Sequence, residues 1–247
     1  MPATPAWPPD STPRLFVEQE LAPGAHIRID GGQAHYLVSV MRMKAGDPVK
    51  LFDDRTGEWL AVAAHIGKRD LSLDVTQLLR PREPVPDLWL CVAPIKKGRI
   101  DWVAEKACEL GVDKLQPVLT RRTVVDRLNL ERLRAHMIEA AEQCGRTALP
   151  SLAEPVKLTA LLRDWPAGRA LFFADETGGL PAAEAMRARP GPAAILIGPE
   201  GGFDTEEREA IRAHPQAVGI ALGPRILRAE TAAAAAVSVW MAAAGDW

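Results

Sequence analysis

The spacing of hydrophobic positions changes about one third of the way along the chain. In the first part, short apolar runs alternate with glycine-containing turns, at 15–17, 26–29, 49–52, 60–66 and 71–78. Short strands at this spacing are typical of a small all-β domain. One helical pattern, over 34–43, interrupts them. We therefore expect a small β-barrel over residues 14–80.

A proline-rich stretch and a different pattern follow. Three prolines lie within residues 80–86, which predicts a stiff linker over 81–86. Beyond it, apolar runs alternate with helical patterns, which favours an α/β domain with a largely parallel sheet over 87–247. The runs are 88–93, 115–119, 170–174, 193–197 and 218–222, and the main helices are 100–110, 130–144, 205–213 and 229–244. Residues 1–13, with five prolines, are expected to form a flexible tail.

Composition narrows the class of protein. The 247 residues are 47% hydrophobic and 25% charged, which is ordinary for a globular protein. The longest nearly uncharged apolar run, 232–244, is too short to span a bilayer, and no basic segment opens the chain. Three cysteines without CxxC spacing suggest neither a disulfide framework nor a zinc site, so we expect no metal and a cytoplasmic protein.

The net charge of −2 hides a local basic segment. Residues 95–147 hold 11 lysines and arginines against eight acidic residues, which makes this the net-basic part of the chain. Phosphate contacts need clustered cations rather than a high total charge, so an RNA footprint would use this segment. A solvated helical face is the alternative interpretation.

Two loops at predicted strand ends could carry chemistry. Ligands of α/β sheets bind beyond the carboxyl ends of the strands. The first loop reads Ile-Gly-Pro-Glu-Gly-Gly-Phe over 197–203, and its glycines permit a positive φ and a close approach of a ligand to the backbone. A sterically demanding turn is the alternative. The second loop, over 222–231, holds Arg225, Arg228 and Glu230, and could instead be a solvated loop with a helix cap.

The nature of the ligand follows from what the loops lack. Neither contains GxxxxGK[ST] or GxGxxG, the usual cradles for nucleotide phosphates. The first loop also has carboxylates at Glu200, Asp204, Glu206 and Glu207, which would repel an anion. A neutral or cationic ligand fits better, such as one with an amino group and a sulfonium.

These motifs together resemble one family. IGPEGGF (197–203) and LGPRILRAETA (222–232) resemble the C-terminal signature of the SPOUT methyltransferases, and specifically of the RsmE family, which methylates uridine N3 in 16S ribosomal RNA. Four upstream segments continue the resemblance in unbroken order, within 14–17, 35–47, 106–112 and 139–146. Ala229 departs from the family, which often has threonine there.

The resemblance implies a fold, a cofactor and partners. It implies a PUA-like N-terminal barrel and a deep trefoil knot in the C-terminal domain, with S-adenosylmethionine held in the knot loops. It also implies a homodimer that acts on 16S rRNA in the small ribosomal subunit. In the last helix, apolar side chains that include Trp240 could lie in that dimer interface or pack in the core of a single chain.

The resemblance also assigns roles to residues. Catalytic roles fall on Arg228, Glu200 and Glu230, of which the glutamates could orient the base or accept its proton; Glu230 could instead only complement the dipole of the last helix. The residues that it implies bind RNA are Arg14, His35, Arg42, Gln143 and Arg146. Those that it implies bind the cofactor are Glu176, Ile197, Gly198, Pro199, Glu200, Gly201, Leu222, Gly223, Ile226, Leu227 and Arg228. Two rival functions stay open: an RNA-binding module without catalysis, and a knotted methyltransferase acting on another position, such as a ribose 2′-hydroxyl.

Overall fold

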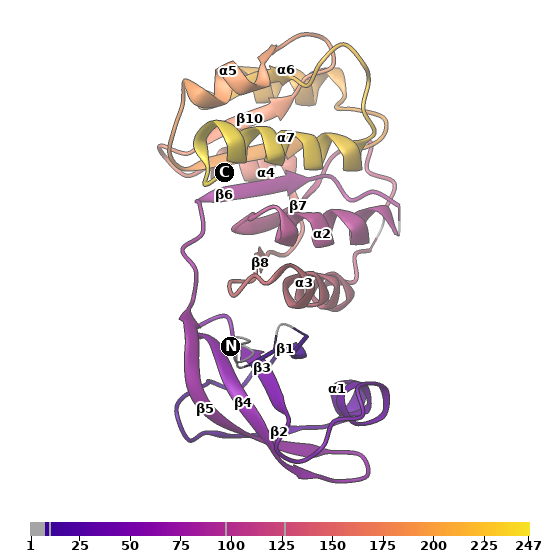
Figure 1. Ribbon diagram of the computed structural model, residues 1–247. Coiled ribbons are helices and arrows are strands. Elements are labelled where there is room, and N and C mark those ends of the chain that lie inside the picture. Colours follow the sequence, from indigo (N-terminus) through magenta and orange to yellow (C-terminus); the bar gives the residue numbers. More distant parts are fainter. Residues whose placement is uncertain (1–7, 10, 97, 126) are drawn as a thin grey trace. The chain divides into compact units, whose positions relative to one another are not determined.

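A computed structural model describes residues 8, 9, 11–96, 98–125 and 127–247 (Figure 1). The chain divides into two compact units. Unit 1 comprises residues 1–84 together with 141–148, and unit 2 comprises 85–140 and 149–247. The tail expected over residues 1–13 lies for the most part outside the described residues.

Unit 1 is built on a five-stranded sheet with the order β1-β3-β4-β5-β2. β1 and β3 pair in parallel, and the other neighbours are antiparallel. The strands follow the predicted apolar runs closely: β1 (Arg14–Phe16), β2 (His26–Ile29), β3 (Pro48–Phe52), β4 (Gly57–Ile66) and β5 (Leu71–Pro81). Buried side chains of the sheet and of the helical segment after β2 form one apolar core, which includes Leu37, Val49, Leu51 and Leu73.

The single helix expected over 34–43 is two shorter elements. α1 (Gly31–His35) runs directly into a π-helical turn, η1 (Tyr36–Val40). The wide turn is closed by the Met41 amide, which donates to the carbonyl of Tyr36 at 2.9 Å. It directs Leu37 into the core and leaves Tyr36 and Val40 exposed. Arg42, in the left-handed region at φ 55°, then ends the helical path.

A buried arginine explains why residues 141–148 belong to unit 1. The Arg14 guanidinium pairs with Glu58 and donates to the carbonyl oxygens of Ala141 and Arg146, the latter at 2.6 Å. Arg80 also donates to Glu58 at 3.2 Å. Burial alone would raise the pKa of Glu58, but the hydrogen bonds from Arg80 and Arg14 outweigh it and hold the pKa below its usual value.

Unit 2 is an α/β unit around an extended parallel sheet. The strand order is β11-β13-β10-β12-β6-β7-β8, every pair is parallel, and β9 pairs with the end of β7. The strands are β6 (Leu88–Val92), β7 (Lys114–Leu119), β8 (Ser151–Leu152), β9 (Val156–Lys157), β10 (Ala170–Ala174), β11 (Leu180–Pro181), β12 (Ala193–Ile197) and β13 (Ala217–Ala221). The α/β class expected for this part is confirmed.

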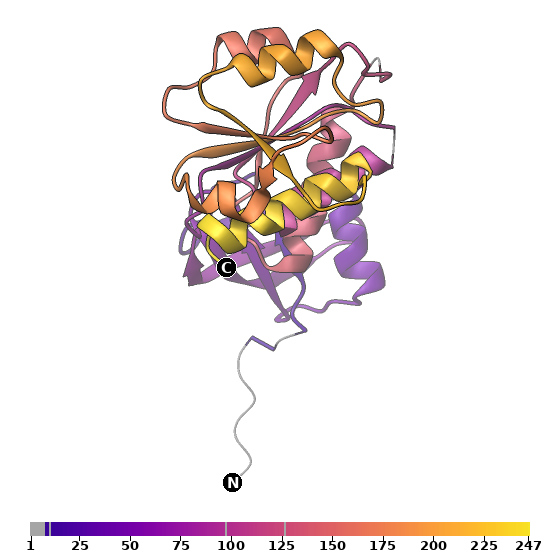
Figure 2. The same ribbon diagram turned by 90° about the horizontal axis from the view of Figure 1, so that it is seen from above.

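Helices cover both faces of this sheet. They are α2 (Arg99–Glu109), α3 (Leu130–Cys144), α4 (Leu158–Arg163), α5 (Ala182–Arg187), α6 (Thr205–Ala213) and α7 (Ala229–Ala244). Figure 2 shows α6 on one face, and α5 and α7 on the other. Both faces of the sheet are therefore shielded from solvent, which explains why the sequences of the central strands are continuous apolar runs. None of the described helices is long and apolar enough to cross a bilayer.

Trp240 belongs to the core of its own chain. Its side chain is 2% exposed on α7, which packs against α2, α5, β6 and β12. This burial requires no second copy, so the core interpretation of the last helix is confirmed for Trp240. The expectation that Trp240 becomes buried on dimer formation is wrong.

We expect Arg14→Ala to destabilise unit 1. The substitution leaves Glu58, whose side chain is 7% exposed, with Arg80 alone and removes the donors to two carbonyl groups. Breaking a buried pair in this way should lower the free energy of unfolding by about 2–4 kcal/mol. Arg28→Ala is the control, because the Arg28–Asp70 pair is largely exposed and should cost at most about 0.5 kcal/mol. Urea unfolding of both variants measures the difference, and equal losses would contradict the structural role of Arg14.

Candidate functional site

Three neighbouring strands of unit 2 end side by side. β13, β10 and β12 are consecutive in the sheet and parallel, so their carboxyl ends meet at one edge. The loops that follow are 175–179 after β10, 198–204 after β12, and 222–228 after β13. Ligands of parallel sheets bind at this edge. The two loops singled out from the sequence are therefore brought together, with a third loop beside them.

A cavity of about 850 Å³ opens between these loops. Its volume lies within the range of roughly 300–1,000 Å³ that is usual for small-molecule sites. Every residue predicted to bind the cofactor lines it. The cavity is also lined by residues that were not predicted to bind the cofactor, namely Arg99, Ala174, Asp175, Thr177, Gly178, Gly179, Gly202, Phe203, Ile220, Ala221, Pro224, Arg225, Ala229 and Ala232.

The glycine-rich loop folds as a tight turn. The Gly202 amide donates to the carbonyl of Pro199 at 2.8 Å. Gly202 has a φ of 68°, whereas Gly198 and Gly201 do not adopt the left-handed region expected for them. Gly198 is needed for space instead, because a Cβ there would lie 3.1 Å from the ring of Phe203. At Gly202, a Cβ would lie 3.0 Å from Oε1 of Glu176.

The loop after β7 holds the glycine-rich loop and the start of α6. Arg122 donates to the carbonyl of Gly201 at 2.6 Å. Arg121 pairs with Asp204 at 2.9 Å and with Glu206 at 2.5 Å. Arg121 therefore offsets part of the negative charge of these two carboxylates, which were expected to repel an anion. The hydrogen bond from the Glu207 amide, followed by the pairing with Arg121, lowers the pKa of Asp204.

Asp175 organises the loop after β10. Its side chain is 1% exposed, and it accepts hydrogen bonds from Arg212 at 2.6 Å and from the Thr177 hydroxyl at 2.8 Å. Burial would raise the pKa of Asp175, but these hydrogen bonds outweigh it and lower the pKa. The neighbouring Glu176 pairs with Arg208. Both carboxylates at this side of the cavity are thus bound to arginines of α6.

The loop after β13 is more open. Arg225 and Arg228 are exposed, and within the described part of the chain neither guanidinium has a hydrogen bond or an ion pair. Ile226, between them, is 91% exposed, an unusual state for a large apolar side chain. Gly223 opens the loop with a φ of 102°. This loop therefore presents two available cations and one uncovered apolar group at the cavity.

The two predicted catalytic glutamates lie differently. Glu200 lines the cavity, and Arg99 donates to its Oε1 at 2.5 Å. Glu230, in the first turn of α7, is absent from the cavity lining; its Oε1 lies 3.6 Å from Nε of Arg99. The sequence identified Arg99 only as part of a basic segment. Because its partners follow β12 and β13, only the topology of the sheet could reveal the cluster.

The predicted RNA-binding residues divide by exposure. His35, Arg42 and Gln143 are exposed and available to a partner. Arg146 is buried, with its Nε 3.6 Å from Glu83, and the largely buried side chain of Arg14 binds protein groups. The geometry therefore gives Arg14 and Arg146 a structural role in unit 1. Direct RNA contact stays a prediction for the three exposed residues.

Two family models match this chain. A model described as an RNA methyltransferase domain matches residues 81–241, and one described as an RNA methyltransferase PUA domain matches residues 29–76. The chain belongs to the RNA methyltransferase family. The cavity lies wholly within the part matched by the first model.

Relatives within the RNA methyltransferase family match over nearly their whole length. Ribosomal RNA small subunit methyltransferase E of Rickettsia conorii is 31% identical, over 91% of this chain and 93% of the relative. The protein of the same name from Bacillus subtilis is 28% identical, over 91% of this chain and 94% of the relative.

Two solved structures are similar to this chain over nearly its whole length. A methyltransferase from Legionella pneumophila, in complex with S-adenosylmethionine, is 30% identical with a TM-score of 0.84, over 96% of this chain and 99% of that one. The small subunit methyltransferase E of Neisseria gonorrhoeae has a TM-score of 0.85 and 24% identity, over 96% of this chain and 99% of that one. At that identity, the second likeness supports the fold alone.

We expect Gly202→Ala to weaken binding of S-adenosylmethionine. Alanine is strained at a φ of 68°, and its Cβ would crowd Glu176, so the loop must shift at the cavity. Strain of this size should lower the affinity by about tenfold or more. Gly191→Ala is the matched control, because Gly191 also has a positive φ, at 107°, but lies away from the cavity lining. Calorimetry should show wild-type affinity for the control; the same affinity in both variants would contradict this function of Gly202.

We expect Asp175→Asn to remove a pH-dependent part of the stability of unit 2. The pKa of Asp175 is lowered in the folded chain, so its contribution is fully present above the unfolded pKa of about 4 and is lost as the pH falls through the folded value. At pH 7 the variant should lose about 2 kcal/mol. The difference from wild type should shrink below about pH 4 in urea unfolding.

Asp164→Asn controls for that experiment. Asp164 also has a pKa lowered by its neighbour Arg163, but its side chain is 63% exposed. This variant should unfold nearly as the wild type does at every pH. A loss for Asp175→Asn that does not change between pH 7 and pH 3.5 would contradict the argument.

Proposed function

We propose that this chain transfers a methyl group from S-adenosylmethionine to uridine N3 of small-subunit (16S) ribosomal RNA. One observation carries the proposal: three adjacent strand-end loops enclose a cavity of about 850 Å³ in a chain of the RNA methyltransferase family. The Legionella pneumophila relative, of 30% identity, contains S-adenosylmethionine in its structure. The names of the curated relatives support the small-subunit RNA as the substrate.

The residues around the cavity fit this cofactor, which supplies an electrophilic methyl group. Gly198 and Gly202 leave the backbone uncovered where a side chain would collide with Phe203 or Glu176. Apolar lining from Ile197, Leu222 and Ile226 suits an adenine ring. The remaining residues proposed to bind the cofactor are Pro199, Glu200, Gly201, Gly223, Leu227, Arg228 and Glu176.

The cavity residues can also serve the transfer itself. The N3–H proton must leave as the new N–C bond forms, and negative charge develops on the base. Arg228, and Arg225 beside it, can stabilise that charge because neither is paired within the described structure. Glu200 is the better candidate for the proton acceptor, because it lines the cavity and Glu230 does not. Glu230 instead complements the dipole of α7.

The domain organisation extends this proposal. We infer a PUA-like RNA-binding barrel over 14–80, a linker over 81–86 and a SPOUT domain over 87–247 that contains a deep trefoil knot. The match of the PUA model over 29–76 supports the first assignment. Exposed Tyr36, Val40 and Met41 lie close in sequence to His35 and Arg42, a combination of apolar and basic groups that suits unstacked RNA bases and phosphates.

We also propose that the chain acts as a cytoplasmic homodimer. Large apolar side chains of unit 2 are uncovered, among them Ile226, Leu180 at 58% and Trp102 at 37% exposure. Trp102 lies on α2, which packs against α7 in the same chain. Covering such groups is a usual consequence of self-association. Trp240 contributes from within the core, by holding α7 in place.

The function is tested by identifying the product. Small ribosomal subunits from cells that lack the endogenous activity are incubated with the protein and labelled S-adenosylmethionine, and the RNA is digested to nucleosides. We expect labelled 3-methyluridine by chromatography and mass spectrometry. A ribose-methylated nucleoside would support the rival methyltransferase function, and no labelled nucleoside together with intact RNA binding would support the non-catalytic module.

Two arginine variants separate chemistry from RNA binding in the same assay. Arg228→Ala should lower the single-turnover rate at saturating RNA by more than it lowers RNA affinity, as expected for a group that acts in the transition state. Arg42→Ala should weaken RNA binding and reduce its salt slope by about one unit, with little change in that rate. A wild-type rate for Arg228→Ala, or an unaltered salt slope for Arg42→Ala, would remove the residue from its proposed role.

A further inference from the structure

Arg99 occupies a position that does not benefit its own helix. It is the first residue of α2, where a positive charge opposes the helix dipole. The N-terminus of α2 is capped by Asp101 instead, which accepts from the Gly98 amide at 3.1 Å. The reason for an arginine at this position must therefore lie outside α2.

The guanidinium of Arg99 lies between two carboxylates of different loops. Nη1 donates to Oε1 of Glu200 at 2.5 Å, and Nε lies 3.6 Å from Oε1 of Glu230. The side chain of Glu200 is 35% exposed, and that of Glu230 is 15% exposed. Oε2 of Glu230 is buried and has no hydrogen-bond partner among the described residues, which leaves Arg99 as the cation that faces this carboxylate in that part of the chain.

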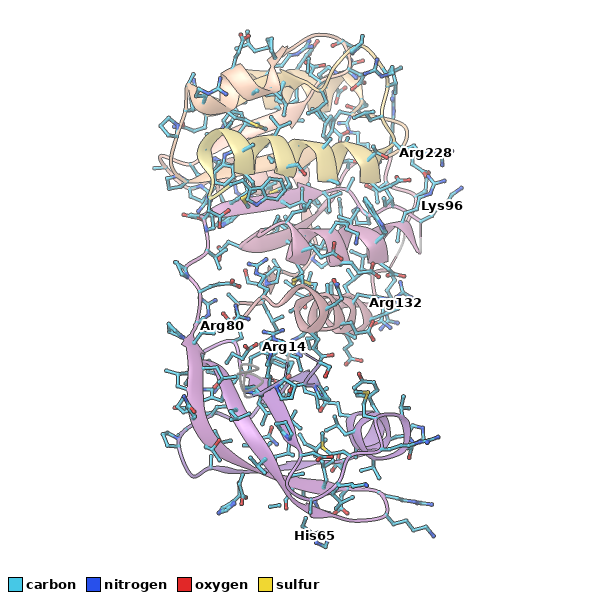
Figure 3. All side chains as sticks on the ribbon, viewed as in Figure 1. Arg14, His65, Arg80, Lys96, Arg132 and Arg228 are labelled. Carbon is cyan, nitrogen blue, oxygen red and sulfur yellow. The ribbon has the colours of Figure 1, made fainter. Side chains whose placement is uncertain are left out.

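The carboxylates that line the cavity are paired with arginines, whereas two arginines of the lining are not paired with a carboxylate in the part of the chain that is described. Each carboxylate in the cavity lining has its own arginine: Asp175 has Arg212, Glu176 has Arg208, and Glu200 has Arg99. Arg225 and Arg228 have no such partner in the described structure. Figure 3 draws Arg228 at the same end of unit 2 as Lys96, an exposed residue of the loop that leads to Arg99. Arg99 offsets part of the negative charge of Glu200 and Glu230, and its removal would leave both carboxylates without this counter-charge near Arg225 and Arg228.

We propose that Arg99 is a positioning residue that pairs with Glu200 and Glu230 and offsets part of their negative charge, so that the mouth of the cavity presents Arg225 and Arg228 to the phosphates of the RNA. The inference rests on the proposed function, because it concerns the RNA substrate of the same site. Arg99 acts through its two partners and takes no part in the transfer of the methyl group.

The test uses full-length protein with substitutions at Arg99, Glu200 and Glu230. Arg99→Ala uncovers two negative charges, which should weaken binding of unmethylated small ribosomal subunits by about tenfold at low salt. Affinity for S-adenosylmethionine, whose sulfonium and amino groups are cationic, should not fall. Arg99→Lys, which keeps the charge, should retain most of the RNA affinity.

Rescue distinguishes charge neutralisation from simple support of the loop. Adding Glu200→Gln to Arg99→Ala should restore RNA affinity, because the uncovered charge at the cavity is removed. Adding Glu230→Gln should instead restore thermal stability, which Arg99→Ala lowers by leaving a buried carboxylate without its cation. If Arg99 only supported the loop, Arg99→Ala/Glu200→Gln would not regain RNA affinity, because this double variant removes a second group from the same contact.

Each outcome decides the proposal. Wild-type RNA affinity in Arg99→Ala, or a folded Arg99→Ala/Glu200→Gln protein that binds RNA no better than Arg99→Ala, would overturn it. Restored RNA affinity in that double variant would support it. Failure of the proposed function is visible separately, as wild-type protein that binds subunits and forms no 3-methyluridine.

Discussion

The adjacency of β13, β10 and β12 in a parallel sheet is the constraint on which the candidate site depends. These strands come from different parts of the second half of the chain, yet their carboxyl ends meet at one edge. The two signature loops are separated by α6 and β13 in sequence and share one cavity for this reason alone. A change in strand order would leave every local turn intact and separate the loops.

The sheet places the loops side by side, and contacts from arginine side chains then restrict the conformation of each loop. The loop after β7 binds the glycine-rich loop through Arg122, α6 binds the loop after β10 through Arg212, and α2 binds the glycine-rich loop through Arg99. Most of these pairs are half-exposed, where a single pair contributes little to global stability. Their consequence is geometric: each restricts one loop at the rim of the cavity, and Arg212 and Arg99 each also pair with one carboxylate there.

Hydrophobic spacing predicted well the helices and strands that are long enough to show a periodic pattern. α6 and α7 begin and end at the residues expected from helical spacing, and the main strands agree to within a few residues. The patterns missed α4, α5 and the two-residue strands because elements this short carry hardly one turn or one pairing of periodic signal. The single helix expected over 34–43 is instead an α-helix followed by a π-helical turn that buries Leu37. Hydrophobic spacing does not distinguish such a turn from an α-helix.

The roles of charged residues could be predicted less well, and arginine shows why. Arg14 and Arg228 belong to equally recognisable segments, and the resemblance implies an RNA contact for Arg14 and a catalytic role for Arg228. In the structure, Arg14 is enclosed by Glu58 and backbone carbonyls, whereas Arg228 has no partner among the described residues. The guanidinium of Arg14 therefore stabilises the fold, whereas that of Arg228 is available to bind a ligand. What separates the two is whether the protein already satisfies the donors, and only tertiary structure supplies that information.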